Sequence, residues 1–423
     1  MGTGKVMQFF SKHTLACFGV SAESVQKTSS KAGNGRSRTH PFRKRSTPMI
    51  VVDESAVWKE RDTYKEIREL THGSEAKTSL TKSTTTGRVY VVKRFSDYGI
   101  PGESIKSNSN SNSNNDNDND RPPSPSKGQP PPNEAKILLT TLRPHPNILG
   151  AFGCDLLGCR RGNLYTEFCN AGDLIDQITF NNAIIKRSAP EEFVLHVFVS
   201  LSNALLYLHH GLRWDGELAR YWQEPSHTAV VHGDIKPDNV FLRWSAKPER
   251  AGMPDVVLGD FGAAQPANRF LGIAGTTGYQ APEAAEVWEL KKKDVEAYRE
   301  KIKTPGLVTR ASDIYSFGQT VFMLCKGRMH VVGADPNTHP VQEGERGFVG
   351  VKLDGPRGYQ TEGLTKAVRW CLQPEPDLRP ETKDGGLLEV VTAFSRELDQ
   401  RGGRMADIHR GMWVVSPPKK GWF

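Results

Sequence analysis

The eight residues from His232 to Asn239, HGDIKPDN, constrain this chain more than any other part of its sequence. Within them, Asp234 is followed two residues later by Lys236 and five residues later by Asn239. Phosphoryl transfer from a nucleotide needs these three groups: a carboxylate to orient the accepting hydroxyl, an ammonium group to neutralise the moving phosphoryl group, and an amide oxygen to hold a metal. The segment therefore indicates phosphotransfer chemistry.

Two later segments extend this interpretation. Asp260-Phe261-Gly262 follows an apolar run typical of a strand, Val256–Leu258, and Ala281-Pro282-Glu283 comes after it. A chance match to one short motif is common, whereas three motifs in this order are hard to obtain by chance. In this order the segments resemble the eukaryotic protein kinase superfamily, and the resemblance covers about residues 62–398.

The resemblance implies an α+β, bilobal protein kinase fold, with a small β-rich N-lobe that has one main helix and a larger, mostly helical C-lobe. The expected divisions are a disordered basic tail (1–48), the N-lobe (62–168) with a low-complexity insertion (103–132), the C-lobe (169–398) and a C-terminal tail (399–423). The insertion, rich in Asn, Asp, Ser and Pro, cannot bury a core and should form a solvated loop.

The basic charge of the chain is concentrated at its N-terminus. The net charge is +8, and residues 1–50 hold nine Lys or Arg against one acid, Glu23. The catalytic body is therefore close to neutral, and no basic pattern interleaved with aromatic residues indicates nucleic-acid binding. Residues 36–45 could be a nuclear address; a mitochondrial presequence and a plain solvated tail stay open as alternatives.

The number and spacing of the cysteines and the hydropathy of the chain indicate the cellular compartment in which we expect this protein. The six cysteines show no zinc-binding spacing, which favours reduced thiols in an intracellular protein of the cytoplasm or nucleus. No apolar run reaches the roughly 18 residues that a membrane span requires, and no secretory signal is recognisable. The sequence does not indicate an oligomeric state.

Local patterns predict several elements. Residues 90–95 and 164–168 are expected to be strands, and residues 133–142 a helix. Ser188–Glu191 resembles a capping box that opens a helix running to about Leu208. Residues 313–325 are apolar on nearly every side, as expected for a buried central helix.

By resemblance, the nucleotide site begins at a glycine-rich loop that contains Gly73 and Ser74. Only the middle glycine is kept, because Thr71 and Ala76 stand at the two outer positions. Glycine lets the backbone approach phosphate without a Cβ in the way, so this loop departs from the family pattern at a point that matters for binding.

The remaining nucleotide-binding residues are also implied by the resemblance. Lys93 is expected to neutralise the α- and β-phosphates and to pair with Glu134. Backbone groups of Glu167 and Cys169 are expected to bind adenine at the hinge that follows Thr166. The full implied set adds Phe241 as the floor of the adenine pocket and Asp173, which would contact the ribose or a basic substrate residue, or simply begin a helix.

The resemblance assigns the catalytic roles as follows. Asp234 is the base that accepts the proton of the substrate hydroxyl, and Lys236 stabilises charge on the γ-phosphoryl group. Asn239 and Asp260 are expected to hold Mg²⁺, with ATP as the phosphate donor. Lys236 before a proline, together with Thr276, is similar to the Ser/Thr-directed members, which act on protein substrates.

One departure concerns activation. The residue before the catalytic aspartate, usually Arg, is Gly233, and residues 263–275 contain no Ser, Thr or Tyr. The phosphate acceptor and its arginine partner are therefore missing together. We expect activity that does not depend on phosphorylation of this segment, in which Thr276 and Thr277 would be the remaining acceptors.

Other residues have expected structural roles. Glu283 should pair with Arg379, and Asp313 should anchor the backbone of the catalytic loop. Residues 211–229 and 284–310 are insertions relative to the family; the lysines Lys291–Lys293 in the second would either select acidic substrates or line a solvated helix face.

Three functions compete at this point. An ATP-dependent Ser/Thr protein kinase agrees with the full set of motifs. A pseudokinase scaffold with weak nucleotide binding agrees with the altered glycine loop and with Val91, where the family usually has alanine. A small-molecule phosphotransferase agrees with the His-Gly-Asp order but not with Lys236-Pro237 or the pairing of Glu283 with Arg379.

Overall fold

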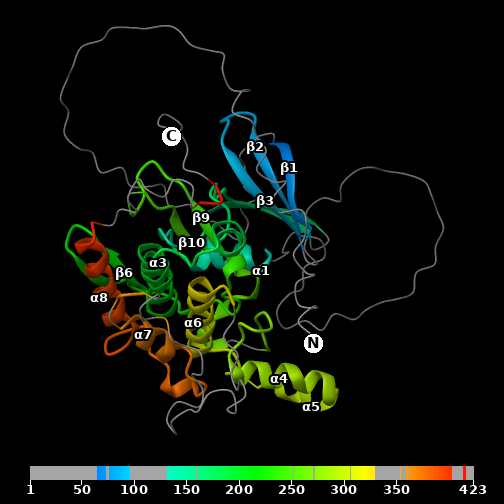
Figure 1. Ribbon diagram of the computed structural model, residues 1–423. Coiled ribbons are helices and arrows are strands. Elements are labelled where there is room, and N and C mark those ends of the chain that lie inside the picture. Colours follow the sequence, from blue (N-terminus) through cyan, green and yellow to red (C-terminus); the bar gives the residue numbers. More distant parts are fainter. Residues whose placement is uncertain are drawn as a thin grey trace, which may run out of the picture. The chain divides into compact units, whose positions relative to one another are not determined.

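The computed structural model describes most of the chain between residues 64 and 402, and a short C-terminal segment (Figure 1). The described residues are 64–72, 76–95, 131–158, 161–250, 252–269, 272–304, 306–328, 353, 359–361, 363–402 and 413–415. The predicted N-terminal tail, Gly73, Ser74 and nearly all of the 103–132 insertion lie outside these residues.

The N-lobe is built on a five-stranded antiparallel sheet with the order β1-β2-β3-β5-β4. Its strands are β1 (Tyr64–His72), β2 (Ala76–Ser83), β3 (Val89–Phe95), β4 (Ala151–Gly158) and β5 (Arg161–Glu167). In β3 the buried Tyr90 and Val92 alternate with Val91 and Lys93, which face the other side of the sheet. The predicted strand 90–95 falls within β3, and the predicted strand 164–168 falls within β5 except for its last residue, since β5 ends at Glu167.

The main helix of the N-lobe lies in the predicted 133–142 segment. One α-helical turn, α1 (Asn133–Lys136), continues as a π-helical turn over Ile137–Thr141. Its apolar residues Ile137, Leu138 and Leu142 are buried, as their spacing predicts. The same segment buries Glu134, a carboxylate that needs a charged partner at that depth.

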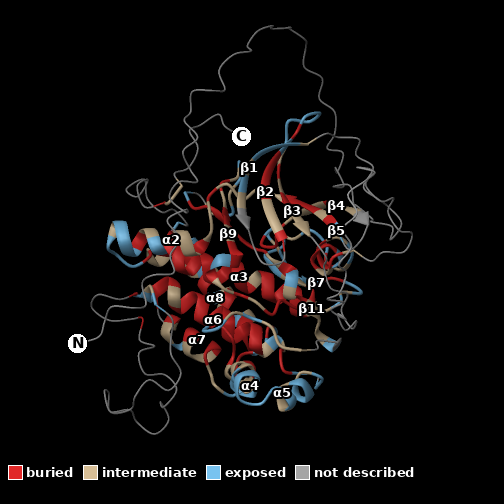
Figure 2. Cartoon of the chain, turned by 90° about the vertical axis from the view of Figure 1, so that its right-hand side faces the viewer, coloured by how far each residue is buried: buried red, intermediate tan, exposed pale blue. Residues whose placement is uncertain are grey.

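The C-lobe is mostly helical. Its helices are α2 (Leu174–Phe180) with a π-turn at Asn181–Ile185, α3 (Glu191–His210), α4 (Pro282–Lys293), α5 (Val295–Lys301), α6 (Arg310–Lys326), α7 (Leu364–Cys371) and α8 (Leu387–Gln400). Figure 2 shows α3 and α6 buried along most of their length, whereas α4 is partly and α5 largely exposed. The prediction of a buried central helix at 313–325 is confirmed by α6, and the α+β bilobal kinase fold is confirmed by the two lobes together.

Helix α3 crosses the C-lobe core. In the part of the chain that the structure describes, it is the one helix long and apolar enough to cross a membrane, and most of it is buried inside the protein. The predicted capping box at Ser188–Glu191 is wrong. Pro190 is the N-cap and no side chain caps the helix, because Ser188 lies two residues before the cap. The Glu191 carboxylate instead accepts hydrogen bonds from Gln360 N and Thr361 N.

Short strand pairs frame the catalytic segment: β8 (Val230–Val231) with β11 (Gln265–Pro266), and β9 (Val240–Arg243) with β10 (Asp255–Leu258). Single 3₁₀ turns cover Pro237–Asn239, Phe261–Ala263, Ala267–Arg269 and Pro376–Leu378. These pairs place the two ends of the catalytic segment beside the residues around Asp260.

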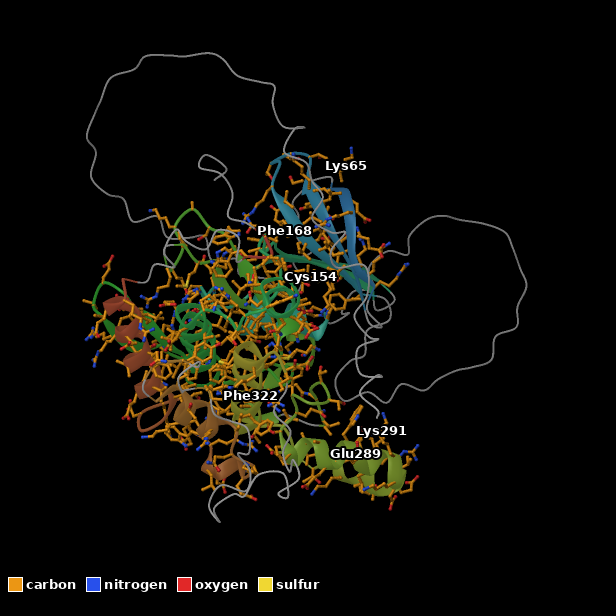
Figure 3. The ribbon with its side chains drawn as sticks, in the orientation of Figure 1. Lys65, Cys154, Phe168, Glu289, Lys291 and Phe322 are labelled. Carbon is orange, nitrogen blue, oxygen red and sulfur yellow. The ribbon has the colours of Figure 1, made fainter. Side chains whose placement is uncertain are left out.

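The two insertions form regular structure. The first contains a hairpin of β6 (Leu212–Asp215) and β7 (Arg220–Gln223), which leaves the rings of Trp214 and Trp222 partly exposed. The second forms all but the first two residues of α4 and all of α5. Glu289 and Lys291 lie on α4 (Figure 3); Lys292 pairs with Glu289, and the Lys291 ammonium lies 4.7 Å from the centroid of the Trp288 ring. These contacts agree with the solvated-face interpretation of the lysines.

Candidate active site

Lys93 lies at the centre of the candidate nucleotide site. Its Nζ atom is 2.7 Å from Glu134 Oε2 and 2.6 Å from Asp260 Oδ1. The three residues come from β3, from the N-lobe helix and from the segment after β10. The predicted pairing of Lys93 with Glu134 is therefore present, and Asp260 shares the same ammonium group.

The charges of this cluster depend on one another. Burial alone would lower the pKa of Lys93, but the carboxylates of Glu134 and Asp260 raise it above its usual value. Burial raises the pKa of Glu134, whose side chain is 3% exposed. For Asp260, the attraction of Lys93 outweighs burial and lowers the pKa. An ammonium that stays charged at neutral pH can bind phosphate.

The backbone turn at Asp260 connects the Lys93, Glu134 and Asp260 cluster to the catalytic segment. Asp260 has φ of 58°, a left-handed conformation that Asp adopts more readily than most residues. Phe261 N donates a hydrogen bond of 3.2 Å to Glu134 Oε1, and the Phe261 ring meets the His232 ring edge-on at 4.8 Å. The position of the N-lobe helix, the turn at Asp260 and the catalytic segment are thus coupled.

Asp234 and Lys236 form a hydrogen-bonded triangle with Thr276. Lys236 Nζ donates to Asp234 Oδ2 at 2.8 Å and to Thr276 Oγ1 at 2.7 Å, and Thr276 Oγ1 donates to Asp234 Oδ1 at 2.8 Å. Asn239 Nδ2 donates to the Asp234 carbonyl at 2.8 Å and to Oδ2 at 3.3 Å. The predicted catalytic residues are therefore brought together.

The donors around Asp234 leave it able to accept one more hydrogen bond. An ionised carboxylate offers about four acceptor positions. Lys236 and Asn239 use those of Oδ2, and Thr276 uses one of Oδ1. The remaining position on Oδ1 can accept a proton from a hydroxyl group, which is the geometry that a general base requires.

Asp313 on α6 holds the backbone before Asp234. Its carboxylate accepts hydrogen bonds from His232 N at 2.8 Å and from Gly233 N at 2.9 Å, and His209 Nε2 lies 3.0 Å from it. The predicted anchoring by Asp313 is confirmed. Gly233 has φ of 80°, a conformation that glycine adopts without strain.

The predicted pairing of Glu283 with Arg379 is also confirmed. Arg379 Nη1 and Nη2 each lie 2.8 Å from a different oxygen of Glu283, a bidentate arrangement. The Arg379 side chain is fully buried and also donates to the carbonyl groups of Gln373 and Pro374. This pair fixes the start of α4 to the segment before α8.

The hinge segment follows β5, where Figure 3 labels Phe168. The Glu167 carboxylate accepts a hydrogen bond of 2.8 Å from Gly150 N and forms an ion pair with Arg243. Burial raises the pKa of the Cys169 thiol well above its usual value, so the thiol stays neutral. The Glu167 side chain thus braces the hinge, and adenine binding by its backbone stays a prediction.

Phe241 and Asp173 lie on the C-lobe side of this hinge. A Cβ built on Gly259 would meet the Phe241 ring at 2.5 Å, so only glycine fits beside the predicted adenine floor. Asp173 caps α2 by accepting a hydrogen bond from Asp176 N at 2.8 Å. Burial, with help from Asp176 and Asp238, raises its pKa to about 7. The structural role of Asp173 is therefore helix capping, whatever it binds.

Two residues that the sequence interpretation missed hold the segment after Asp260. Asn133 Nδ2 donates to the carbonyls of Gly262 at 3.2 Å and Ala264 at 2.7 Å. Gln280 Nε2 donates to the carbonyls of Ala274 at 2.9 Å and Gly275 at 3.0 Å. Asn133 directly precedes Glu134 and reads as an ordinary helix-start residue, and no local pattern marks Gln280.

The donor atoms near Asp260 fit a magnesium ion that is bound together with nucleotide phosphates. Because Asn239 Nδ2 is turned toward Asp234, its amide oxygen faces away, and the Asp260 side chain is 41% exposed. Mg²⁺ prefers such hard oxygen ligands and usually keeps several waters, with few carboxylates from the protein. Among the described residues, no three His, Cys, Asp or Glu side chains gather as a self-contained metal site.

Comparison with known proteins agrees with this geometry. Residues 64–385 match the protein kinase domain family. The chain is 30% identical over 278 residues to the G2-specific protein kinase nim-1 of Neurospora crassa, covering 62% of this chain and 28% of that protein. It is 33% identical over 187 residues to the serine/threonine-protein kinase Nek2 of Homo sapiens, covering 43% of this chain and 33% of Nek2.

The G2-specific protein kinase nimA of Emericella nidulans is 27% identical over 279 residues, covering 62% of this chain and 35% of nimA. The chain therefore spans about a third of the length of the relatives it matches. The family match, by contrast, extends over most of this chain and includes the kinase motifs from Lys93 to Arg379. The chain belongs to the protein kinase family.

Proposed function

We propose that this chain is a Ser/Thr protein kinase that transfers the γ-phosphoryl group of ATP, with Mg²⁺, to serine or threonine of protein substrates. The observation that carries the proposal is the completeness of two linked clusters. Lys93 pairs with both Glu134 and Asp260, and the Asp234 carboxylate is held by Lys236 and Thr276. A scaffold protein has no need of both clusters.

When bound, MgATP supplies the phosphoryl group and the metal charge that offsets its negative oxygens. Lys93 orients the phosphates, while Asp260 and the amide oxygen of Asn239 are placed to bind the metal. Asp234 Oδ1 orients the substrate hydroxyl and accepts its proton, and Lys236 neutralises charge on the transferred group. Thr276 keeps both side chains in place.

Direction toward serine and threonine is supported by the contacts of Lys236 and Thr276. These two side chains meet at Asp234, where a hydroxyl acceptor would enter. The human relative is a serine/threonine-protein kinase by name. Because the matched region is about a third of each relative, the protein substrates of this chain are part of the proposal.

We further infer that activity does not require phosphorylation between residues 263 and 275. In phosphorylation-dependent kinases, a phosphate and an arginine order this segment by charge-assisted hydrogen bonds. Here side-chain amides and backbone pairing fill that role. Gln280 and Asn133 hold the two ends, and β11 pairs with β8 in between.

Phosphotransfer to a mixture of basic proteins tests the main proposal. Wild-type chain with Mg²⁺ and ATP labelled at the γ-phosphate should yield phosphoserine or phosphothreonine, and neither Asp234→Asn nor Lys93→Met should do so. Phosphate appearing only on an aminoglycoside or another small molecule would contradict it. So would nucleotide binding without any transfer, which is the behaviour of a pseudokinase scaffold.

The hydrogen bonds from the Gln280 side-chain amide to the backbone, here called the amide brace, are removed to test the second proposal. Gln280→Met removes two hydrogen bonds to backbone carbonyls. If each bond contributes about 1 kcal/mol to ordering this segment in the active state, kcat should fall about thirtyfold. Gln223→Met is the matched control, because Gln223 Nε2 also donates to a backbone carbonyl, that of His210, outside the site. Equal kcat for Gln280→Met and wild type would contradict the role of the brace.

A further inference from the structure

Residues 413–415, which the sequence places in a tail beyond the kinase domain, pack against the C-lobe core. This short red segment lies beside β9 in Figure 1. The Trp413 side chain is 6% exposed. Its ring meets the Phe193 ring edge-on at 4.9 Å and the Trp244 ring edge-on at 5.7 Å. These are favourable geometries for aromatic pairs.

Two hydrogen bonds between core side chains and the backbone hold the two residues that follow Trp413. Trp244 Nε1 donates to the Val415 carbonyl at 3.0 Å, and Val414 N donates to Gln177 Oε1 at 3.0 Å. Trp244 and Gln177 are themselves buried. Because buried polar groups need partners, the two bonds fix the path of the segment as well as its depth.

The contacts of Trp413 lead directly to the hinge. Trp244 N donates to Asn170 Oδ1 at 2.7 Å, and Asn170 Nδ2 donates to the Trp244 carbonyl at 3.4 Å. Asn170 is the residue after Cys169, where the hinge ends. Trp244 also directly follows β9, which carries Phe241, the predicted floor of the adenine pocket.

Backbone pairing adds a second link between the same elements. Ala171 N donates to the Leu242 carbonyl at 2.9 Å, and Leu242 N donates to the Gly172 carbonyl at 2.8 Å. The residues after the hinge and the strand under the adenine pocket are therefore tied to each other along their length. Trp413 packs on Trp244, which directly follows this strand.

We propose that Trp413 is a positioning residue for the nucleotide pocket. By packing on Trp244, it holds the end of β9 and, through Asn170, the exit of the hinge. The C-terminal segment 413–415 then sets nucleotide affinity without contacting the nucleotide. This inference rests on the nucleotide binding in the proposed function, but not on phosphoryl transfer.

The test compares nucleotide binding by full-length variants. The dissociation constant of MgADP is measured by titration calorimetry well below the unfolding temperature. Trp413→Ala should weaken MgADP binding about three- to tenfold, as for other residues that act through a packed neighbour. Trp413→Phe, which keeps an aromatic ring, should bind MgADP nearly as tightly as wild type. In turnover, KM for ATP should rise by the same factor while kcat stays within about twofold.

Two further variants make the result specific. Trp222→Ala, on the partly exposed ring of the β6–β7 hairpin, should bind MgADP like wild type. Asn170→Ala should weaken binding as Trp413→Ala does, and the double variant should be no weaker than either alone, because both act on one path.

Each alternative outcome has a definite meaning. If Trp413→Ala lowers the unfolding temperature but binds MgADP like wild type, Trp413 is a stability anchor and the proposal is overturned. Additive losses in the double variant would overturn the path through Asn170. A wild-type chain that binds no MgADP would overturn this inference together with the proposed function, whereas binding without phosphoryl transfer would leave it standing.

Discussion

Replacement of Asp313 by asparagine should disable the catalytic segment through its backbone. The Asp313 carboxylate accepts hydrogen bonds from two backbone N–H groups, of His232 and Gly233, and from the His209 ring. Burial lowers the pKa of His209, so its ring is neutral, and its other nitrogen meets the Thr382 hydroxyl. An asparagine side chain has one acceptor oxygen, so its amino group must face at least one of these donors.

The size of the effect follows from these contacts. A hydrogen bond to a charged group contributes about 1.5–3 kcal/mol, and a buried donor without a partner costs about 1–3 kcal/mol. Loss of one bond, with the others weakened to neutral ones, should lower the free energy of unfolding by about 2–4 kcal/mol. For a lobe of roughly 200 residues this corresponds to a decrease in Tm of about 5–10 °C.

Thermal unfolding and steady-state kinetics together check this prediction. Asp313→Asn should also lower kcat more than tenfold, because the backbone of Gly233 leads directly into Asp234. The control is Glu289→Gln, the same acid-to-amide change in an exposed pair with Lys292, which should leave Tm and kcat as in wild type. An Asp313→Asn variant with the Tm and kcat of wild type would refute the reasoning.

Two further predictions concern stability. Arg379→Met leaves the Glu283 carboxylate without its buried partner and should lower the free energy of unfolding, measured by denaturant titration, by about 3–5 kcal/mol. Lys292→Met, in the exposed pair with Glu289, should change it by less than about 0.5 kcal/mol. Equal effects of the two variants would contradict the stabilising role of the buried pair. Asp173→Asn keeps an N-cap for α2 and removes a carboxyl whose pKa is raised by burial to about 7. Since the native state then binds more protons than the unfolded state between about pH 4 and 7, wild-type stability falls as pH rises through this window, at up to about 1.4 kcal/mol per pH unit. The Tm of Asp173→Asn relative to wild type should therefore rise from pH 5 to pH 8; a difference that is independent of pH would contradict this.

The sequence predicts the parts of this site that depend on local spacing. Asp234 and Asp260 are recognised because each stands at a fixed place in a short motif. Lys93 and its partner Glu134 were expected only through the family resemblance, and the fold brings them to Asp260. The buried pair of Glu283 with Arg379 joins residues far apart in sequence, and it was expected only because the family resemblance supplies it. Local chemistry alone does not indicate either partner.

The contacts that sequence reasoning missed are of another kind. Gln280 and Asn133 act through side-chain amides on backbone carbonyls, which any Gln or Asn can do at many places. Trp413 lies outside the expected kinase domain, and the residues next to it in the sequence form no pattern that predicts a core position. The capping box at Ser188 failed because a matching pattern does not fix where the helix begins; Pro190 does.

Transfer of labelled phosphate by phosphatase-treated chain tests the central claim most directly. Wild-type chain is treated with a protein phosphatase, freed of it, shown by mass spectrometry to carry no phosphate between residues 263 and 277, and assayed at once with MgATP and a basic protein mixture. We predict an initial rate equal to that of untreated chain and no transfer by Asp234→Asn. A treated wild-type chain no more active than Asp234→Asn would contradict the account.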